Sequence, residues 1–205
     1  MQILFKLFLK ENPVIVVFLI LRYLILPLKT VISYLPAKGN ILEVGSGHGL
    51  LSYYFASNNK NLSIIGIDPD LKRINFAKRN FGNLENLKFK DGLFDSKYEK
   101  KDLDCIIFYG VFCLMNDESV ISFLKTSKMK MKKNSVIYIS DIIKNQKSLI
   151  YHFHIFRENF FKIIGFTKGN VVISRSNEKW NEIFRKSGFT KIKIIKVKVP
   201  LHSTI

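Results

Sequence analysis

The sequence predicts an α/β domain with a doubly wound, mostly parallel sheet, preceded by an apolar helical extension. Three observations predict this fold class. Beyond Pro36, short apolar runs alternate with segments of helical periodicity. Two of the runs, "CIIFY" and "VIYIS", are apolar throughout, which is typical of parallel strands that are covered on both faces. A glycine-rich turn, "ILEVGSGHGLLS", joins the first run to the helical segment that follows it.

The strands and helices of this domain are set by where the apolar runs and the helical periodicity begin and end. Strands are expected over residues 40–44, 62–67, 87–90, 103–109 and 135–140. Helices are expected over residues 50–57, 71–80 and 118–132, the last of them capped by Asp117. Because strands and helices alternate along the chain, neighbouring strands are predicted to run parallel. A chain of 205 residues is the size of one such domain.

The regular alternation stops after Asp141. Residues 142–176 are predicted to form an insertion, or lid, over the edge of the sheet. A helix is expected over residues 177–186, and Gly188 is well suited to end it. In "KIKIIKVKV", residues 191–199, lysine alternates with branched apolar residues. This pattern predicts an antiparallel strand with one face in water.

The first 35 residues are predicted to form the apolar helical extension, and residues 36–205 the main domain. Between Pro13 and Pro27 lie 13 residues with a single charge, that of Arg22, whereas a membrane-spanning helix needs about 20. No small-residue cleavage site follows, which argues against a signal peptide. Basic and aromatic residues flank or interrupt the stretch. Two interpretations remain equally favoured: an interfacial helix that lies on a membrane, or a helix packed on the protein's own core.

The net charge of +17 is concentrated in the second half of the chain. From Leu124 onward there are 18 basic and 4 acidic side chains. This surplus suits a phosphate-bearing small molecule, an anionic lipid or a nucleic acid, and lysines spread over a solvated face explain it equally well. Cys105 and Cys113 fit neither a CxxC pair nor a disulfide framework. Buried thiols and a reducing, cytoplasmic location are therefore expected.

The glycine turn indicates a ligand site. In an open α/β sheet, ligands bind beyond the carboxyl ends of the strands, at the point where the strand order reverses. Glycines let a ligand approach the main chain there, and the following helix offers unpaired N–H groups. Glu43 lies just before the turn, where its carboxylate would repel a pyrophosphate and attract a cationic amino group. The spacing also differs from GxGxxG, the dinucleotide fingerprint.

The pattern E-x-G-x-G-x-G over residues 43–49 resembles the first motif of the class I S-adenosylmethionine-dependent methyltransferases, whose fold is Rossmann-like. The resemblance covers residues 36 to about 200. It implies that the turn holds the methionine part of S-adenosylmethionine, the expected cofactor. The residues concerned are Glu43, Gly45, Ser46, Gly47 and Gly49.

The ends of the next strands extend this resemblance. "IIGID" ends in Asp68, followed by Pro69, and an acid at that strand end is placed to accept both hydroxyls of a ribose. "LKFKDG" ends in Asp91 and Gly92, where the family uses an acid to accept a hydrogen bond from the adenine amino group. In "DLDCIIFYGVF", Tyr109 leaves the fourth strand toward the pocket. The resemblance implies that all of these residues bind the cofactor.

The sequence also departs from the family. The family's sheet closes with a seventh strand paired with the sixth, whereas this sequence ends five residues after Pro200. We expect "LHSTI" either to form a stub of that strand or to be the point where a longer chain is cut. No metal is predicted, because metal-dependent catechol-type members need clustered acids and Asp141 has no clear acidic companion.

The sequence indicates the catalytic base and the methyl acceptor only indirectly. Residues 109–112, "YGVF", stand where adenine- and glutamine-modifying members carry an Asn/Asp-Pro-Pro-aromatic run, so methylation of nucleic acid is less favoured. A base that takes a proton from the acceptor is expected in the insertion. His152, His154 and Glu158 are the candidates, and a structural role is the alternative for each. The phenylalanines of the same segment would form an apolar roof.

These observations favour a methyltransferase that acts on a small-molecule or lipid-like acceptor, associated with a membrane or bound to a carrier. The protein is then expected in the cytoplasm, in peripheral contact with the inner membrane. An RNA or protein methyltransferase that uses the basic second half is the alternative. A non-catalytic binding protein that kept the fold is the third hypothesis, and the intact acids at three strand ends argue against it.

Overall fold

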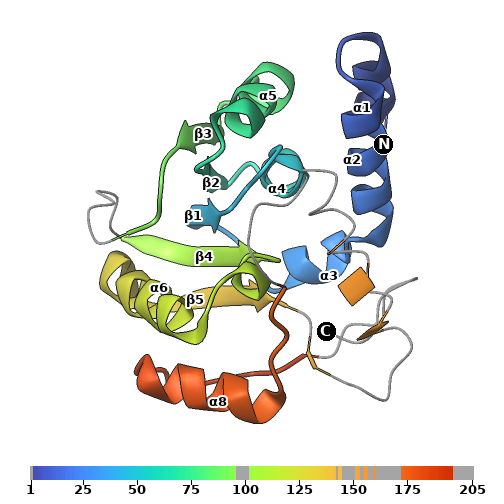
Figure 1. Ribbon diagram of the computed structural model, residues 1–205. Helices are drawn as coiled ribbons and strands as arrows, with labels where there is room; N and C mark the ends of the chain where they lie inside the picture. Colours follow the sequence, from blue (N-terminus) through green and yellow to red (C-terminus); the bar gives the residue numbers. More distant parts are fainter. Residues whose placement is uncertain are drawn as a thin grey trace.

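The computed structural model describes residues 2–95, 102–141, 143–144, 151–152, 155–156, 159 and 172–195. A five-stranded sheet in the order β3-β2-β1-β4-β5 forms its centre (Figure 1). The strands are β1 (Gly39–Val44), β2 (Leu62–Asp68), β3 (Leu87–Asp91), β4 (Leu103–Tyr109) and β5 (Met131–Ser140). All neighbouring pairs in this sheet run parallel. The predicted α/β fold with a doubly wound parallel sheet is confirmed.

Helices cover both faces of the sheet. The covering helices are α4 (Leu50–Asn58) and α5 (Leu71–Phe81) on one face, and α6 (Asp117–Lys130) and α8 (Asn177–Lys186) on the other (Figure 1). Successive strand residues enter opposite cores, so that Ile41 is buried on the α4 side and Leu42 on the α6 side. Burial on both faces explains why the strands read as unbroken apolar runs.

Short helical elements precede the sheet. They are α1 (Gln2–Lys6), the 3-10 turn η1 (Leu7–Leu9), α2 (Pro13–Ile25) and α3 (Leu28–Ser33). Asn12 caps α2, because its side chain accepts the Val14 N–H at 2.9 Å. Pro13 occupies the first turn of α2, where its missing N–H leaves no helical hydrogen bond unmade. The local sequence therefore fixes where this apolar helix begins.

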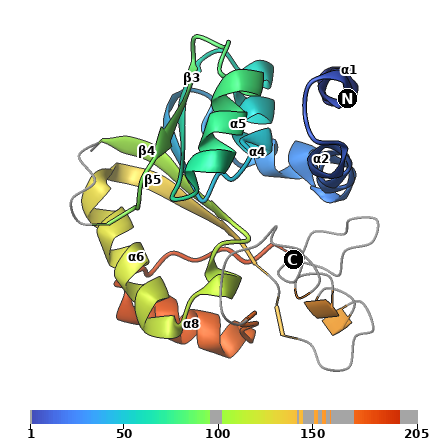
Figure 2. The same cartoon turned by 45° about the horizontal axis from the view of Figure 1, so that its top comes forward.

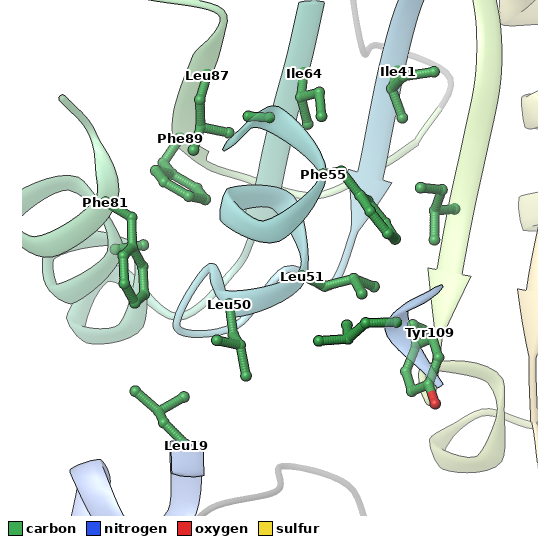
Figure 3. Packing of buried hydrophobic residues seen from close by; sticks show 14 of the residues in the cluster. Leu19, Ile41, Leu50, Leu51, Phe55, Ile64, Phe81, Leu87, Phe89 and Tyr109 are labelled. Carbon is green, nitrogen blue, oxygen red and sulfur yellow. The ribbon is translucent and has the colours of Figure 1, made fainter. Parts of the chain in front are cut away.

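One face of α2 packs against the helices on the α4 side (Figure 2). Val16 and Leu19 are fully buried there, and Leu19 faces Leu50 of α4 (Figure 3). The interpretation of a helix packed on the protein's own core is confirmed for this face. None of the described helices combines the length and the apolar character that crossing a bilayer requires.

The passage from α6 to β5 differs from the prediction. The helix ends at Lys130 and the strand begins at Met131, whereas the sequence predicted a helix to residue 132 and a strand from residue 135. Pairing with β4 explains the early start of the strand. Met131 pairs with Leu103, and Lys132 Nζ lies 2.9 Å from each carboxylate oxygen of Asp104.

The ends of two helices test the predicted caps. Asn116 caps α6 by accepting a backbone N–H of the first turn, so the prediction of Asp117 as the cap is wrong. Asp117 instead pairs with Arg175 at 2.8 Å. At the end of α8, Gly188 has a φ of +79° and donates its N–H to the Arg185 carbonyl at 3.0 Å. This is the expected left-handed ending.

The described part of the segment after α8 does not form the predicted antiparallel strand. Residues 191–195 are in no strand, and residues 196–199 lie outside the described residues. Ile192 and Ile194 are 41% and 48% exposed, so the alternating pattern does not bury an apolar face. Lys193 Nζ lies 5.4 Å from the ring centre of Tyr34. The segment thus contacts the end of α3.

Candidate functional site

The glycine turn joins β1 to α4 in a left-handed backbone conformation. Gly45, Gly47 and Gly49 have φ angles of +75°, +55° and +82°, which glycine adopts without steric cost. At Gly49 an added Cβ would lie 2.6 Å from the Phe89 ring, whereas at Gly47 nothing lies within 4 Å. Gly49 therefore allows close packing inside the protein. Gly47 instead faces open space.

Asp68 ties this turn to the end of β2. Its Oδ2 accepts the Gly47 N–H at 2.9 Å, and its Oδ1 accepts the Asp70 N–H at 2.9 Å. The Gly45 and Ser46 N–H groups both donate to the Ile67 carbonyl. The side chain of Asp68 is held in place by these bonds, and each carboxylate oxygen keeps a further lone pair for another donor.

Glu43 is buried in β1, below the turn. The Ser52 hydroxyl of α4 donates a hydrogen bond to its Oε2. Burial raises the pKa of Glu43 to about 7, while the Ser52 hydrogen bond and the charge of Arg22 act in the opposite direction. A carboxyl group in this state is partly ionised at neutral pH. A nearby cation would shift it to the ionised form.

The other predicted residues lie along the same edge of the sheet. Asp91 pairs with Asp68 in the sheet register, but its side chain is 61% exposed and 3.9 Å from Lys78 Nζ. The Gly92 N–H donates to the Asp68 carbonyl at 3.2 Å. Tyr109 ends β4 and is buried against the α4 side of the core (Figure 3). The structure therefore gathers the ends of β1 to β4 around the turn.

His48 lies in the turn, but it is part of a packing contact. Its ring lies 5.1 Å from the Phe76 ring and 6.1 Å from the Phe18 ring, between α5 and α2. Burial, with Arg73 and Arg22 nearby, lowers the pKa of His48 to about 4. The imidazole is therefore neutral at physiological pH. It connects α2 to the glycine turn.

Comparison with known families decides what kind of domain carries this site. A profile described as "Methyltransferase domain" matches residues 20–194, which is most of the chain. The chain belongs to this methyltransferase family. One curated relative is the ubiquinone biosynthesis O-methyltransferase of Pelagibacter ubique, to which this methyltransferase is 30% identical over 112 residues. The aligned region covers 54% of this chain and 45% of that protein. The chain spans less than half the length of the curated relatives that it matches.

Solved structures share the fold of the methyltransferase. The pyocyanin biosynthetic protein PhzM has a TM-score of 0.69 at 13% identity, over 86% of this chain and 52% of PhzM. CalO1, a methyltransferase in calicheamicin biosynthesis whose structure is the SAH-bound form, has a TM-score of 0.56 at 15% identity. That likeness covers 76% of this chain and 44% of CalO1. At these identities the comparison establishes the fold.

S-adenosylmethionine is the methyl donor of this family, and the residues around the turn fit it. Nothing lies within 4 Å of the position that a Cβ would occupy at Gly47, Gly92 or Gly110. Ser46 Oγ is buried and has no hydrogen-bond partner among the described residues. With the buried Glu43 carboxyl group, the edge of the sheet offers open space, an available hydroxyl and an acid that a cation would ionise.

The catalytic candidates are only partly described by the structure. His152 lies in a helical segment with an exposed side chain, and its ring is 5.3 Å from that of Tyr151. Tyr151 is buried, and its hydroxyl lies 2.7 Å from Ser174 Oγ. His154 and Glu158 lie outside the described residues. The assignment of a base to this segment stays a prediction.

Arg175 is a buried residue that sequence reasoning missed. It is 2% exposed and donates to the carbonyls of Phe112 and Met115 at 2.8 and 2.5 Å. Its Nε donates to Asp117 at 2.8 Å, and its guanidinium lies 5.5 Å from the Trp180 ring centre. These bonds hold the loop that follows β4. No local signal could have identified the residue, because its partners lie far along the chain.

Replacing Arg175 with lysine is expected to lower the free energy of unfolding by about 1–3 kcal/mol. A single ammonium group cannot reach the Phe112 and Met115 carbonyls and the Asp117 carboxylate together. Urea unfolding measures the loss. Arg185→Lys is the matched control, because Arg185 is exposed on the last turn of α8. Equal losses of unfolding free energy in the two variants would show that the hydrogen bonds of the buried Arg175 guanidinium do not add to stability.

Proposed function

We propose that this methyltransferase methylates a small, apolar or lipid-like acceptor, carried in a membrane or on a carrier. The similarity to an O-methyltransferase of ubiquinone biosynthesis is the observation that carries the proposal. The structural neighbours PhzM and CalO1, named for pyocyanin and calicheamicin biosynthesis, support a small-molecule acceptor. The apolar helices beside the site support the lipid-like character. The proposed location is cytoplasmic, with peripheral contact to the inner membrane.

The proposed cofactor site combines the strand-end residues with the turn. Glu43 would face the ammonium group of the methionine part, and Asp68 would accept both ribose hydroxyls with its remaining lone pairs. Asp91 is free to turn toward the adenine, since its side chain is exposed and its contact with Lys78 is long. The remaining members are Gly45, Ser46, Gly47, Gly49, Pro69, Gly92 and Tyr109.

The chain's own contribution to the reaction is alignment and proton acceptance. When bound, S-adenosylmethionine supplies a methyl group on a sulfonium centre. The protein must hold the acceptor atom in line with that methyl group. For a hydroxyl acceptor, a base must also take its proton. His152, His154 and Glu158 stay the proposed candidates for this base.

Tracing the methyl group identifies the acceptor class. Cell extract is incubated with the protein and isotopically labelled S-adenosylmethionine, then separated into an organic-solvent fraction, RNA and protein. The expected result is label in a molecule of the organic-solvent fraction. The Asp68→Ala variant serves as the control for label that does not depend on the cofactor site. Label in RNA or protein instead would overturn the proposed acceptor while leaving the methyltransferase activity intact.

A further inference from the structure

The amino-terminal helices turn a row of apolar side chains toward solvent. We call this row the outer apolar face, and its members are Phe5, Leu9, Val14, Val17, Leu21 and Leu24. Their exposed fractions range from 46% for Val17 to 89% for Leu9. Single exposed apolar residues are ordinary. These six lie on elements that pack together, since α1 and η1 both contact α2, and such a set marks an interaction surface.

The four members on α2 lie on one face of that helix. Val14, Val17, Leu21 and Leu24 follow one another at intervals of three, four and three residues in α2, and such positions lie on one side of a helix. The opposite side, which includes Leu19, is buried on the core. The core therefore already occupies the inner side of α2. The outer side is available for a partner.

The charges beside the face favour an anionic partner. Lys6 and Lys10 are exposed next to it. Glu11 is the only acid in the first 35 residues, and it turns inward to Arg79 and Asn80 at 3.0 and 2.7 Å. Apolar side chains bordered by lysines, with the acid withdrawn, are typical of helices that lie on anionic lipid.

We infer that the outer apolar face of α1, η1 and α2 docks on the surface of an anionic membrane. With 13 residues, α2 is too short to cross a bilayer, so it lies along the surface. A second copy of the chain fits the face less well. A symmetric contact would place each apolar face and its lysines against the same face of the partner, with like charges opposed.

Docking would bring the glycine turn close to the membrane. Phe18 on the inner side of α2 contacts His48 of the turn, and His48 contacts Phe76 of α5. The surface that meets lipid and the surface that holds the turn thus belong to one helix. The docking locates the proposed peripheral membrane contact on the molecule and does not depend on the proposed activity. Only the delivery of a lipid-like acceptor from the membrane to the site rests on it.

Vesicle flotation at low salt tests the inference. The full chain is mixed with vesicles of phosphatidylcholine and phosphatidylglycerol in equal amounts and centrifuged through a density gradient. Wild type is expected to float. Val14→Glu combined with Leu21→Glu is expected to reduce the bound fraction by about tenfold or more, because two apolar contacts become anionic. Lys6→Gln and Lys10→Gln are expected to weaken binding by about fivefold each.

Met129→Glu combined with Val136→Glu is the matched control. Both residues are exposed apolar side chains, 64% and 47%, on α6 and β5, away from α2 (Figure 1). This variant is expected to float as wild type does.

Wild type that stays at the bottom of the gradient overturns the inference, and so does a Val14→Glu/Leu21→Glu variant that floats normally. A wild-type dimer that this variant converts to a monomer would assign the face to a second copy. Flotation measures membrane binding and requires no methyl transfer, so its outcome is independent of the proposed activity.

Discussion

Replacing Asp68 with alanine is expected to weaken S-adenosylmethionine binding by roughly a hundredfold to ten-thousandfold. The proposed role gives Asp68 two hydrogen bonds from the ribose hydroxyls, and hydrogen bonds to a charged group contribute about 1.5–3 kcal/mol each. Titration calorimetry, with cofactor added until the protein is saturated, measures the affinity. The comparison variant is Glu85→Ala, which removes an exposed carboxylate just before β3, at the opposite end of that strand from the site.

Asp68 also holds the turn, so the two roles need to be separated. Alanine removes the acceptors of the Gly47 and Asp70 N–H groups, and some loss of stability will accompany the loss of affinity. Asp68→Asn keeps one carbonyl oxygen as an acceptor but places an amide NH₂ group against the other backbone N–H, so it removes the charge together with one acceptor. Binding as tight as wild type in the alanine variant would remove Asp68 from the cofactor site. No binding by wild type at millimolar cofactor would defeat the whole assignment.

The sheet and the position of the site could be predicted because both depend on local patterns. Strands buried on both faces leave unbroken apolar runs, and these runs located β1 to β4 within about a residue. Once the strands are parallel, their carboxyl ends share one edge. Asp68, Asp91 and the glycine turn then had to lie near one another. The chemistry of that edge followed from topology.

Features that depend on distant contacts could not be predicted. The start of β5 at Met131 is set by pairing with Leu103, while the lysines around it have no strand pattern. Arg175 acquires its role from Asp117 and from two carbonyls far along the chain. The exposed isoleucines of residues 191–195 show the reverse case. There a strand-like alternation exists, but the segment pairs with no strand, and Lys193 contacts the Tyr34 ring at the end of α3 instead.

The state of Glu43 is another property that only burial determines, and it leads to a pH prediction. Its pKa is about 7 in the folded protein, above the ordinary value of about 4.3 in an unfolded chain. Below about pH 4.3, Glu43 is protonated in both the folded and the unfolded state, and its contribution to the free energy of unfolding is at its maximum. As pH rises to about 7, the unfolded state ionises first, so the free energy of unfolding falls. The fall is about 1.4 kcal/mol per pH unit, or roughly 3–4 kcal/mol in all.

Glu43→Gln is therefore expected to change stability and cofactor affinity in opposite directions. Glutamine does not ionise, and its side-chain oxygen can still accept a hydrogen bond from the Ser52 hydroxyl. Between pH 4 and pH 8 the free energy of unfolding of the variant should therefore not show the fall that Glu43 causes in wild type. The difference in stability between variant and wild type should shift in favour of the variant over this range. Its affinity for S-adenosylmethionine should fall, because the ammonium group loses its counter-charge.

Measurements across pH decide between an electrostatic and a structural role for Glu43. Wild-type affinity should rise by up to about tenfold per unit as pH approaches 7 and level off above it, since the ionised carboxylate binds the cation. The Glu43→Gln variant should show no such rise. Glu85→Gln, which alters an exposed acid, should follow wild type in both stability and affinity. If the Glu43→Gln variant keeps the wild-type slope in calorimetry, another group titrates, and the buried carboxylate only supports the turn.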